Sequence, residues 1–247
     1  MQEQTTTPIK PYNQEDQSKA AEVEQMFNAI APKYDLLNHL LSMNIDKGWR
    51  KKAINSLKDL KPLSRILDVA TGTGDLAILA NKMLNVPVAG TDLTEGMIEI
   101  GRQKVAKLGL ENEISLSKAD SEALPFASGE FDAVTVAFGV RNYAHLDKGL
   151  AEMARVLRPG GRMVILEFSR PRSFPMKQLY MFYFRNILPI IGRCVSKDRR
   201  AYEYLPESVL AFPDGTDFEE YLTNAGVKPV KRISLTFGIA TIYIAEK

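Results

Sequence analysis

Short runs of β-branched and apolar residues alternate with helical stretches from residue 65 onward, and this alternation constrains the fold more than any other feature. The strand-like runs occupy 65–71, 87–93, 114–120, 131–138 and 162–169. The segments between them carry apolar residues at helical spacing, over 74–84, 95–108 and 146–157. Alternating strands and helices are typical of βαβ units, whose strands pair in parallel. The pattern therefore predicts a mostly parallel sheet with helices on both faces.

The C-terminal region departs from this pattern. Its spacing predicts a helix over 217–227, followed by strands over 228–235 and 239–247. Only residues 236–238 separate the two strands, which is too short for a crossover, so they should pair antiparallel. We expect an α/β fold with seven strands that ends in an antiparallel hairpin.

The residues before the first strand divide into two parts. Residues 1–17 are polar and lack the apolar centre of a signal peptide, so we expect a disordered leader. The pattern over 18–30 and 48–60 predicts two helices outside the sheet. We assign 18–62 to an N-terminal helical cap over the active site and 63–247 to the main domain.

Charge and cysteine content exclude several classes of protein. The formal net charge is only +2, so the whole chain is not basic enough to indicate a nucleic-acid partner. The single Cys194 cannot form an intramolecular disulfide, and His39 and His145 are not spaced like zinc ligands. No stretch approaches the roughly 20 apolar residues that cross a bilayer. We expect a metal-free site and a cytoplasmic protein.

A glycine-rich loop, DVATGTGDLA, follows the first predicted strand. Gly72 and Gly74 allow a sharp turn that opens onto a helix N-terminus. The third glycine of a dinucleotide-binding loop is replaced by Ala77, and Asp75 disfavours a pyrophosphate. The loop therefore favours a neutral or cationic ligand.

Acidic and hydroxyl side chains end the next two strands. Asp92 can accept hydrogen bonds from ribose hydroxyls, Asp120 from an exocyclic amine, and Ser121 can contact an adenine edge. In an open α/β sheet the carboxyl ends of the strands face one crevice, so these residues predict an adenosine site. The alternative is that both aspartates only cap the following helices.

A polar turn follows the fourth predicted strand. The apolar run 133–138 leads through Gly139 to Arg141 and Asn142. A solvated turn would explain this stretch alone, but its position at the same sheet edge places it beside the predicted adenosine site.

Three longer stretches resemble one family. They are YDLLNHLLSMNIDKGW (34–49), FGVRN (138–142) and RVLRPGGRMVILEFS (155–169). Together they resemble the UbiE/MenG C-methyltransferases of menaquinone and ubiquinone biosynthesis, which are class I S-adenosylmethionine-dependent methyltransferases. The resemblance runs from about residue 22 to the end of the chain. It implies a Rossmann-like fold, S-adenosylmethionine as methyl donor with S-adenosylhomocysteine as product, and a polyprenylated quinol as substrate.

The resemblance also implies cofactor contacts by position. These fall on Thr73, Asp92, Asp120 and Ser121, beside the loop glycines Gly72 and Gly74. Two positions depart from the family pattern. Ala137 replaces a serine that often contacts the cofactor, and Asp46 stands where many members have a histidine.

The resemblance also implies a chemical role for the two polar residues of this turn, Arg141 and Asn142. Arg141 stays charged at all ordinary pH values, so we expect it to stabilise a developing phenolate, with Asn142 orienting the same oxygen. Tyr34 is expected to close the pocket and relay the proton, and Asp35 is a less favoured partner. His145 is an alternative base, although we favour a structural role at the start of the next helix. Structural roles are also expected for His39 and Trp49.

A basic and aromatic insertion at about 170–215 bears on the substrate. Within 170–200, eight Lys or Arg residues accompany the single acid Asp198, and the run LYMFYF lies among them. Such a segment suits peripheral contact with an anionic membrane surface and a prenyl tail. The alternative is that the aromatic run packs on the sheet while the charges face solvent.

We therefore expect C-methylation of demethylmenaquinol to menaquinol, on the cytoplasmic face of the inner membrane. Three alternatives stay open at this point. They are methylation of 2-methoxy-6-polyprenyl-benzoquinol in ubiquinone synthesis, an inactive cofactor-binding adaptor at the membrane surface, and an NAD-dependent oxidoreductase. The oligomeric state, including a homodimer, is also left open.

Overall fold

A computed structural model of the protein describes residues 9–36, 42, 44–183, 186 and 199–247. The strands are β1 (Ile66–Val69), β2 (Val88–Asp92), β3 (Ile114–Lys118), β4 (Phe131–Ala137), β5 (Leu157–Phe168), β6 (Lys228–Leu235) and β7 (Ala240–Glu246). The α-helices are α1 (Lys19–Ile30), α3 (Ile45–Asn55), α4 (Asp75–Leu84), α5 (Glu95–Lys107), α6 (Leu146–Val156), α7 (Met176–Phe182), α9 (Arg199–Ala211) and α10 (Thr216–Asn224). Short 3₁₀ turns are η1 (Ala31–Lys33), η2 (Val140–Asn142) and η4 (Thr236–Gly238).

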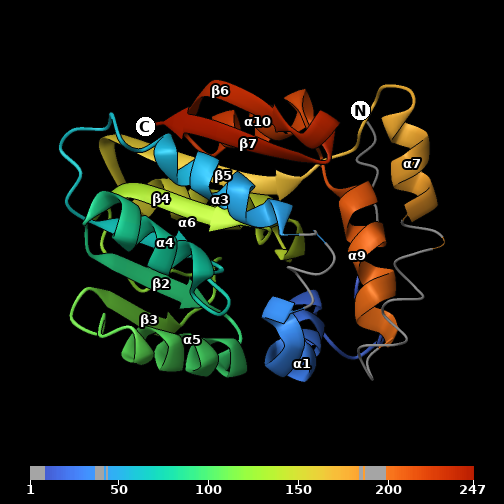
Figure 1. Ribbon diagram of the computed structural model, residues 1–247, viewed down its shortest axis with the longest axis horizontal. Coiled ribbons are helices and arrows are strands. Elements are labelled where there is room, and N and C mark those ends of the chain that lie inside the picture. The colour runs from blue at the N-terminus through green and yellow to red at the C-terminus, as the bar shows by residue number, and fades with distance from the viewer. Residues whose placement is uncertain (1–8, 37–41, 43, 184–185, 187–198) are drawn as a thin grey trace.

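The strands form one seven-stranded sheet in the order β3-β2-β1-β4-β5-β7-β6 (Figure 1). β1 to β5 pair in parallel, whereas β7 is antiparallel to both β5 and β6. This confirms the predicted parallel sheet with a C-terminal antiparallel hairpin. The strand order reverses between β1 and β4, so a crevice opens at the carboxyl ends of these two strands.

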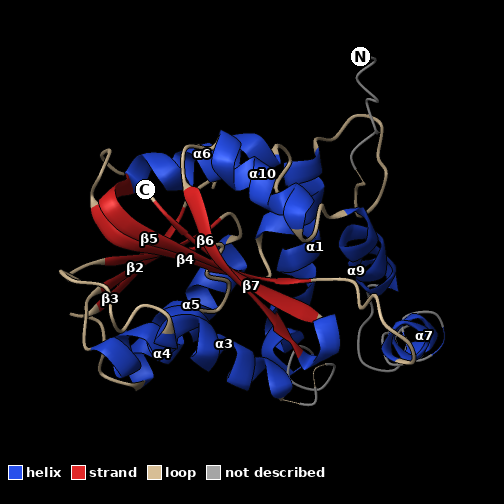
Figure 2. Cartoon of the chain, turned by 90° about the horizontal axis from the view of Figure 1, so that it is seen from above, coloured by secondary structure: helices blue, strands red, loops and turns tan. Residues whose placement is uncertain are grey.

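Helices cover both faces of the sheet (Figure 2), and an apolar layer lies between helices and sheet on each face. One contains side chains of α3, α4 and α5, such as Ile54, Leu76 and Ile98. The other contains side chains of α6 and α10, such as Leu150 and Phe218. Because both faces are covered, β4 is buried along almost its whole length.

Element boundaries differ from the predicted ones at two places. β5 begins at Leu157, ahead of the expected 162, because Leu157 pairs with Phe131 before a register shift. α3 begins at Ile45 and ends at Asn55, ahead of the predicted 48–60. The left-handed backbone of Asn44 (φ 60°) starts this helix early.

The two N-terminal helices occupy different layers. α1 lies across the ends of the strands, with α9 beyond it, whereas α3 packs its Trp49, Ala53 and Ile54 onto the sheet face (Figure 1). Residues assigned to a leader, 9–17, are held to α1. The buried carboxylate of Glu22 accepts hydrogen bonds from the amides of three of them, at 2.6 to 2.9 Å.

No helix within the described ranges is both long enough and apolar enough to cross a membrane.

Candidate active site

A cavity lies at the carboxyl ends of β1, β2 and β4, where the strand order reverses. It contains about 720 Å³ of space free of atoms, part of it open to solvent. Ala20, Val23 and Phe27 of α1 form one apolar wall, and the strand ends form the opposite wall. The cavity therefore lies between the N-terminal helix and the sheet.

The charged residues that line this cavity are all acids. Asp92, Asp120 and Glu122 line it, and no described lining residue is Lys, Arg or His. A pyrophosphate would meet three carboxylates and no cation there, which is electrostatically unfavourable. The donor set suits a ligand that is cationic or neutral at this place, as the glycine loop also indicates.

The loop after β1 forms part of the lining through Gly72. Its backbone has φ +58°, which is strained for other residues, and an added Cβ would lie 3.7 Å from the Tyr34 ring. Gly74 (φ +82°) precedes α4 and lies outside the described lining. Below the loop, the buried Asp68 accepts a hydrogen bond from Thr71 Oγ1 at 2.6 Å.

Asp92, at the end of β2, joins two loops of the cavity. Its carboxylate accepts hydrogen bonds from the amides of Gly72 and Thr94, both at 2.9 Å. Burial raises the pKa of Asp92 above its ordinary value, although these hydrogen bonds oppose the change. A carboxylate offers about four acceptor positions, so Asp92 can still accept a hydrogen bond from a ligand hydroxyl.

The structure differs from the expectation at Thr73. The Thr73 hydroxyl donates to Asp35 Oδ1 at 2.6 Å and accepts from Lys104 Nζ at 2.9 Å. Lys104 also pairs with Asp35 at 2.5 Å and with Asp75 at 2.7 Å. The Thr73 side chain therefore belongs to an ion-pair cluster outside the described lining, and it fastens the residue after Tyr34 to the glycine loop.

Asp120 and Ser121 line the cavity after β3, as their position at the strand end predicts. Asp120 Oδ1 accepts a hydrogen bond from the amide of Glu122 at 2.9 Å. This contact makes Asp120 a local turn cap, which leaves its other oxygen available to a ligand.

The segment FGVRN forms a tight turn at the end of β4. Phe138 has a left-handed backbone (φ 61°), and η2 follows at once. Asn142 is buried and lines the cavity, with Nδ2 3.5 Å from the carbonyl oxygen of Phe138. Among the described residues, nothing donates a hydrogen bond to Asn142 Oδ1. A buried acceptor without a donor is costly, so this oxygen marks a place for a ligand donor.

Arg141 has a different orientation from the expected one. Its guanidinium donates to the Phe138 carbonyl and pairs with the buried Glu167 at the end of β5, at 3.0 Å. The side chains of both residues are buried, and Arg141 is not among the described lining residues. Burial raises the pKa of Glu167, while Arg141 acts in the opposite direction. Arg141 thus braces the turn from behind the cavity wall.

Tyr34 lines the cavity opposite the glycine loop. Its ring packs edge-on against Phe27, with ring centroids 5.8 Å apart. Tyr34 follows directly after η1, so the end of the α1 segment carries it to the cavity mouth.

Four other residues weighed in the sequence have these positions. His145 precedes α6 and contacts Glu122 Oε2 through Nδ1 at 2.8 Å, outside the described lining. Asp46 pairs with Arg50 at 3.3 Å within α3. The core position predicted for Trp49 is confirmed, since it is 6% exposed and donates to Thr236 Oγ1. His39 lies outside the described residues.

Within the part of the chain that the structure describes, no three His, Cys, Asp or Glu side chains come together to hold a metal ion.

A model of the ubiE/COQ5 methyltransferase family matches residues 14–247. The chain belongs to this family. A ubiE/COQ5 relative from Bacteroides fragilis, named demethylmenaquinone methyltransferase, is 51% identical over 240 residues, which is 97% of each chain. A Geotalea daltonii protein, named ubiquinone/menaquinone biosynthesis C-methyltransferase UbiE, is 47% identical over 93% of this chain and 97% of its own.

The ubiE/COQ5 chain also resembles solved structures in its fold. A SAM-dependent methyltransferase from Aquifex aeolicus matches with a TM-score of 0.57 at 21% identity, over 79% of this chain and 88% of that one. Such a likeness shows the class I methyltransferase fold, as predicted.

Two residues of the site in this ubiE/COQ5 member were missed in the sequence. Glu167 is the one acid in the stretch RMVILEFS and directly follows the apolar run 163–166, which is a signal for a buried ion pair. Lys19 donates to the carbonyls of Arg141 and Tyr143 from more than a hundred residues away, and no local pattern indicates that contact.

Proposed function

We propose that this chain catalyses S-adenosylmethionine-dependent C-methylation of demethylmenaquinol to menaquinol, with S-adenosylhomocysteine as the other product. Family membership and the 51% identical relative support this assignment. One observation of the site supports it most: among the described residues, three acids and no cation line the cavity, and the buried amide oxygen of Asn142 has no donor. That combination suits a cationic methyl donor beside a hydroxylated ring.

The cofactor fits the residues that line the cavity. Asp92 would accept from the ribose hydroxyls, Asp120 and Ser121 would meet the adenine, and Gly72 would allow close approach of the ligand. When bound, S-adenosylmethionine supplies an electrophilic methyl group on a positively charged sulfur. The expected contact of Thr73 would use its backbone, since its hydroxyl is engaged by Asp35 and Lys104.

On the substrate side, Asn142 Oδ1 would accept a hydrogen bond from the ring hydroxyl next to the carbon that is methylated. This contact orients the ring and satisfies the buried oxygen. Arg141 supports that role from behind, because its bonds to Phe138 and Glu167 fix the turn that carries Asn142. As the methyl group passes from sulfur to the ring carbon, that carbon loses its own proton and the ring hydroxyl is kept, so one proton leaves per turnover. Tyr34, which lines the cavity, would relay that proton toward solvent.

The benzoquinol precursor of ubiquinone is the second candidate substrate. The name of the Geotalea relative, at 47% identity, covers both pathways, and this favours keeping both.

The test is anaerobic transfer of a labelled methyl group from S-adenosylmethionine to each purified quinol, with the product identified by mass spectrometry. We expect menaquinol from demethylmenaquinol. Isothermal titration with S-adenosylhomocysteine and NADH runs in parallel. Cofactor binding without transfer to either quinol would indicate the inactive adaptor, and preference for NADH would indicate an oxidoreductase.

Peripheral membrane contact is part of the same proposal, and an apolar surface supports it. Phe174, Leu179 and Phe182, at or next to α7, are 82%, 56% and 58% exposed, and Phe237 of η4 is 75% exposed. We call these four residues the apolar rim. Both ribbon views place α7 and the hairpin tip at the same end of the molecule (Figures 1 and 2).

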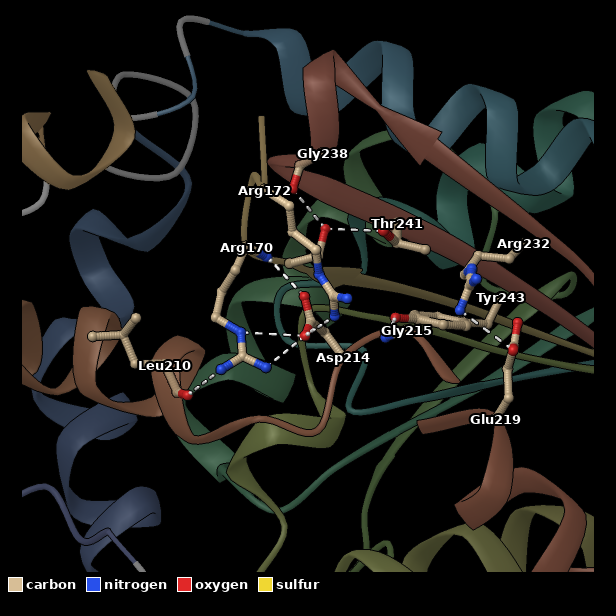
Figure 3. A network of polar contacts seen from close by, with 11 residues as sticks. Arg170, Arg172, Leu210, Asp214, Gly215, Glu219, Arg232, Gly238, Thr241 and Tyr243 are labelled. Atoms are coloured by element: carbon tan, nitrogen blue, oxygen red, sulfur yellow. Dashed lines mark hydrogen bonds and ion pairs between the residues drawn. The ribbon is translucent and has the colours of Figure 1, made fainter. Parts of the chain in front are cut away.

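The base of the insertion is fixed to the sheet next to this rim. Buried Asp214 binds Arg170 at 2.6 Å and Arg172 at 3.4 Å, and Ser169 Oγ donates to the Gly238 carbonyl at 2.8 Å (Figure 3). Arg172 is 74% exposed, so it can meet anionic headgroups while the rim enters the lipid.

Replacing Phe174 and Phe182 with serine is expected to lower co-sedimentation with phosphatidylglycerol vesicles by about fivefold or more, because two exposed aromatic anchors are lost. Tyr221→Ser on α10 is the matched control, since it removes an exposed aromatic outside the rim. Equal loss in both variants, or binding insensitive to salt, would contradict the proposed surface.

A further inference from the structure

Lys19 links α1 to the turn that carries Asn142. Its ammonium donates hydrogen bonds to the carbonyl oxygens of Arg141 at 3.2 Å and Tyr143 at 2.8 Å. The Arg141 carbonyl belongs to the peptide that enters Asn142, and the Tyr143 carbonyl lies just beyond it. Lys19 therefore holds the backbone on both sides of Asn142, whose side-chain oxygen has no donor among the described residues.

Burial, the helix dipole and Arg141 all disfavour a charged lysine at this position. Lys19 is the first residue of α1, where the helix dipole disfavours a cation. Burial and the nearby positive charge of Arg141 lower the pKa of Lys19 to about 8, and Glu122 opposes that change. Glu122 is itself shared, because it also contacts His145. Because burial, the helix dipole and Arg141 all disfavour its charge, Lys19 indicates a function other than stabilising the helix.

The same helix forms the cavity wall. Ala20 and Val23, which follow Lys19 by one and four positions, line the cavity opposite the strand ends. Docking of α1 and placement of Asn142 are therefore coupled through one side chain.

We propose that Lys19 is a positioning residue for methyl transfer, which sets the Asn142 amide when α1 covers the cavity. This inference rests on the proposed function for its kinetic part. Its structural part, that the Lys19 contacts order the turn, can be tested without turnover.

The first test compares Lys19→Met with Lys19→Arg. Lys19→Met keeps an unbranched side chain out to Cε and removes the ammonium donors, so kcat should fall by about tenfold or more, while the Kd of S-adenosylhomocysteine changes less than about twofold. Lys19→Arg keeps charge and donors and should restore most of the kcat.

The matched control is Lys118→Met. Lys118 also reaches from the main domain to α1, through Glu24 at 2.5 Å, but it has no described contact with the turn. This control distinguishes a fall in kcat caused by loosening of α1 from one caused by misplacement of Asn142. If Lys118→Met lowers kcat as much as Lys19→Met does, the positioning role is wrong.

The pH profile supplies a second readout. The wild-type kcat should fall as pH rises through about 8, because the folded-state pKa of Lys19 lies there and loss of its charge weakens both hydrogen bonds. In Lys19→Arg this fall should be absent, since arginine stays charged. The same fall in both proteins would overturn the proposal.

Hydrogen exchange over residues 138–146 tests ordering without any activity. Lys19→Met should speed amide exchange there, whereas Lys118→Met should not. Unchanged exchange in Lys19→Met would refute the inference even if the chain methylates a quinol. Faster exchange in a chain that methylates no quinol would instead sustain the ordering role and refute only the proposed function.

Discussion

Asn142→Ala is expected to lower kcat for methyl transfer by about 100-fold, because it removes a buried side-chain amide that lines the cavity beside the proposed substrate. Cofactor affinity should change little, since Asp92, Asp120 and Ser121 lie on other strand ends. The measurement is kcat with demethylmenaquinol, together with the Kd of S-adenosylhomocysteine.

The stability of a second variant, Asn142→Leu, provides the control for Asn142→Ala. Asn142 Oδ1 is buried without a donor among the described residues, so an apolar side chain of similar volume removes a cost of folding. Asn142→Leu should therefore unfold at an equal or higher urea concentration than the wild type while being inactive. Wild-type kcat in Asn142→Ala would remove Asn142 from the reaction.

Glu167→Gln is expected to lower the free energy of unfolding by about 3–5 kcal/mol, because it leaves the buried Arg141 cation without its counter-ion. Turnover should fall as well, since the turn loses its tie to β5. Urea unfolding with linear extrapolation measures the first effect.

The double variant Arg141→Met with Glu167→Leu tests whether the unpaired buried charge causes this loss of stability. Replacing both members of a buried pair with apolar residues should recover most of the lost stability, because no buried charge is left. Arg141→Met alone should lower kcat by about 100-fold at unchanged cofactor affinity. If Glu167→Gln is as stable as the wild type, the pair does not hold the turn.

Most of the fold could be predicted because the sheet imposes a strong pattern on the sequence. β4 is buried on both faces, and its apolar run ends at Phe138 where the cavity begins. The hairpin followed from the three residues between β6 and β7, which leave no room for a crossover. Layer assignment was harder: α1 and α3 have similar spacing, but only α1 reaches the cavity.

The residues that line the cavity could be predicted where their position on a strand end decides it. Asp92, Asp120 and Ser121 line the cavity because parallel strands end at one edge. Side-chain direction within a turn is decided by partners distant in sequence. Glu167 draws Arg141 away from the cavity, and Asp35 with Lys104 engages Thr73. The lone acid of β5 signals a buried ion pair but does not identify Arg141 as its partner, and no local pattern indicates the contacts of Thr73.

A crystal structure with S-adenosylhomocysteine tests the central claim most directly. We predict that the cofactor sulfur faces Asn142 while Arg141 stays paired with Glu167. A sulfur directed at another wall, or an Arg141 guanidinium that leaves Glu167 and enters the cavity, would contradict the account.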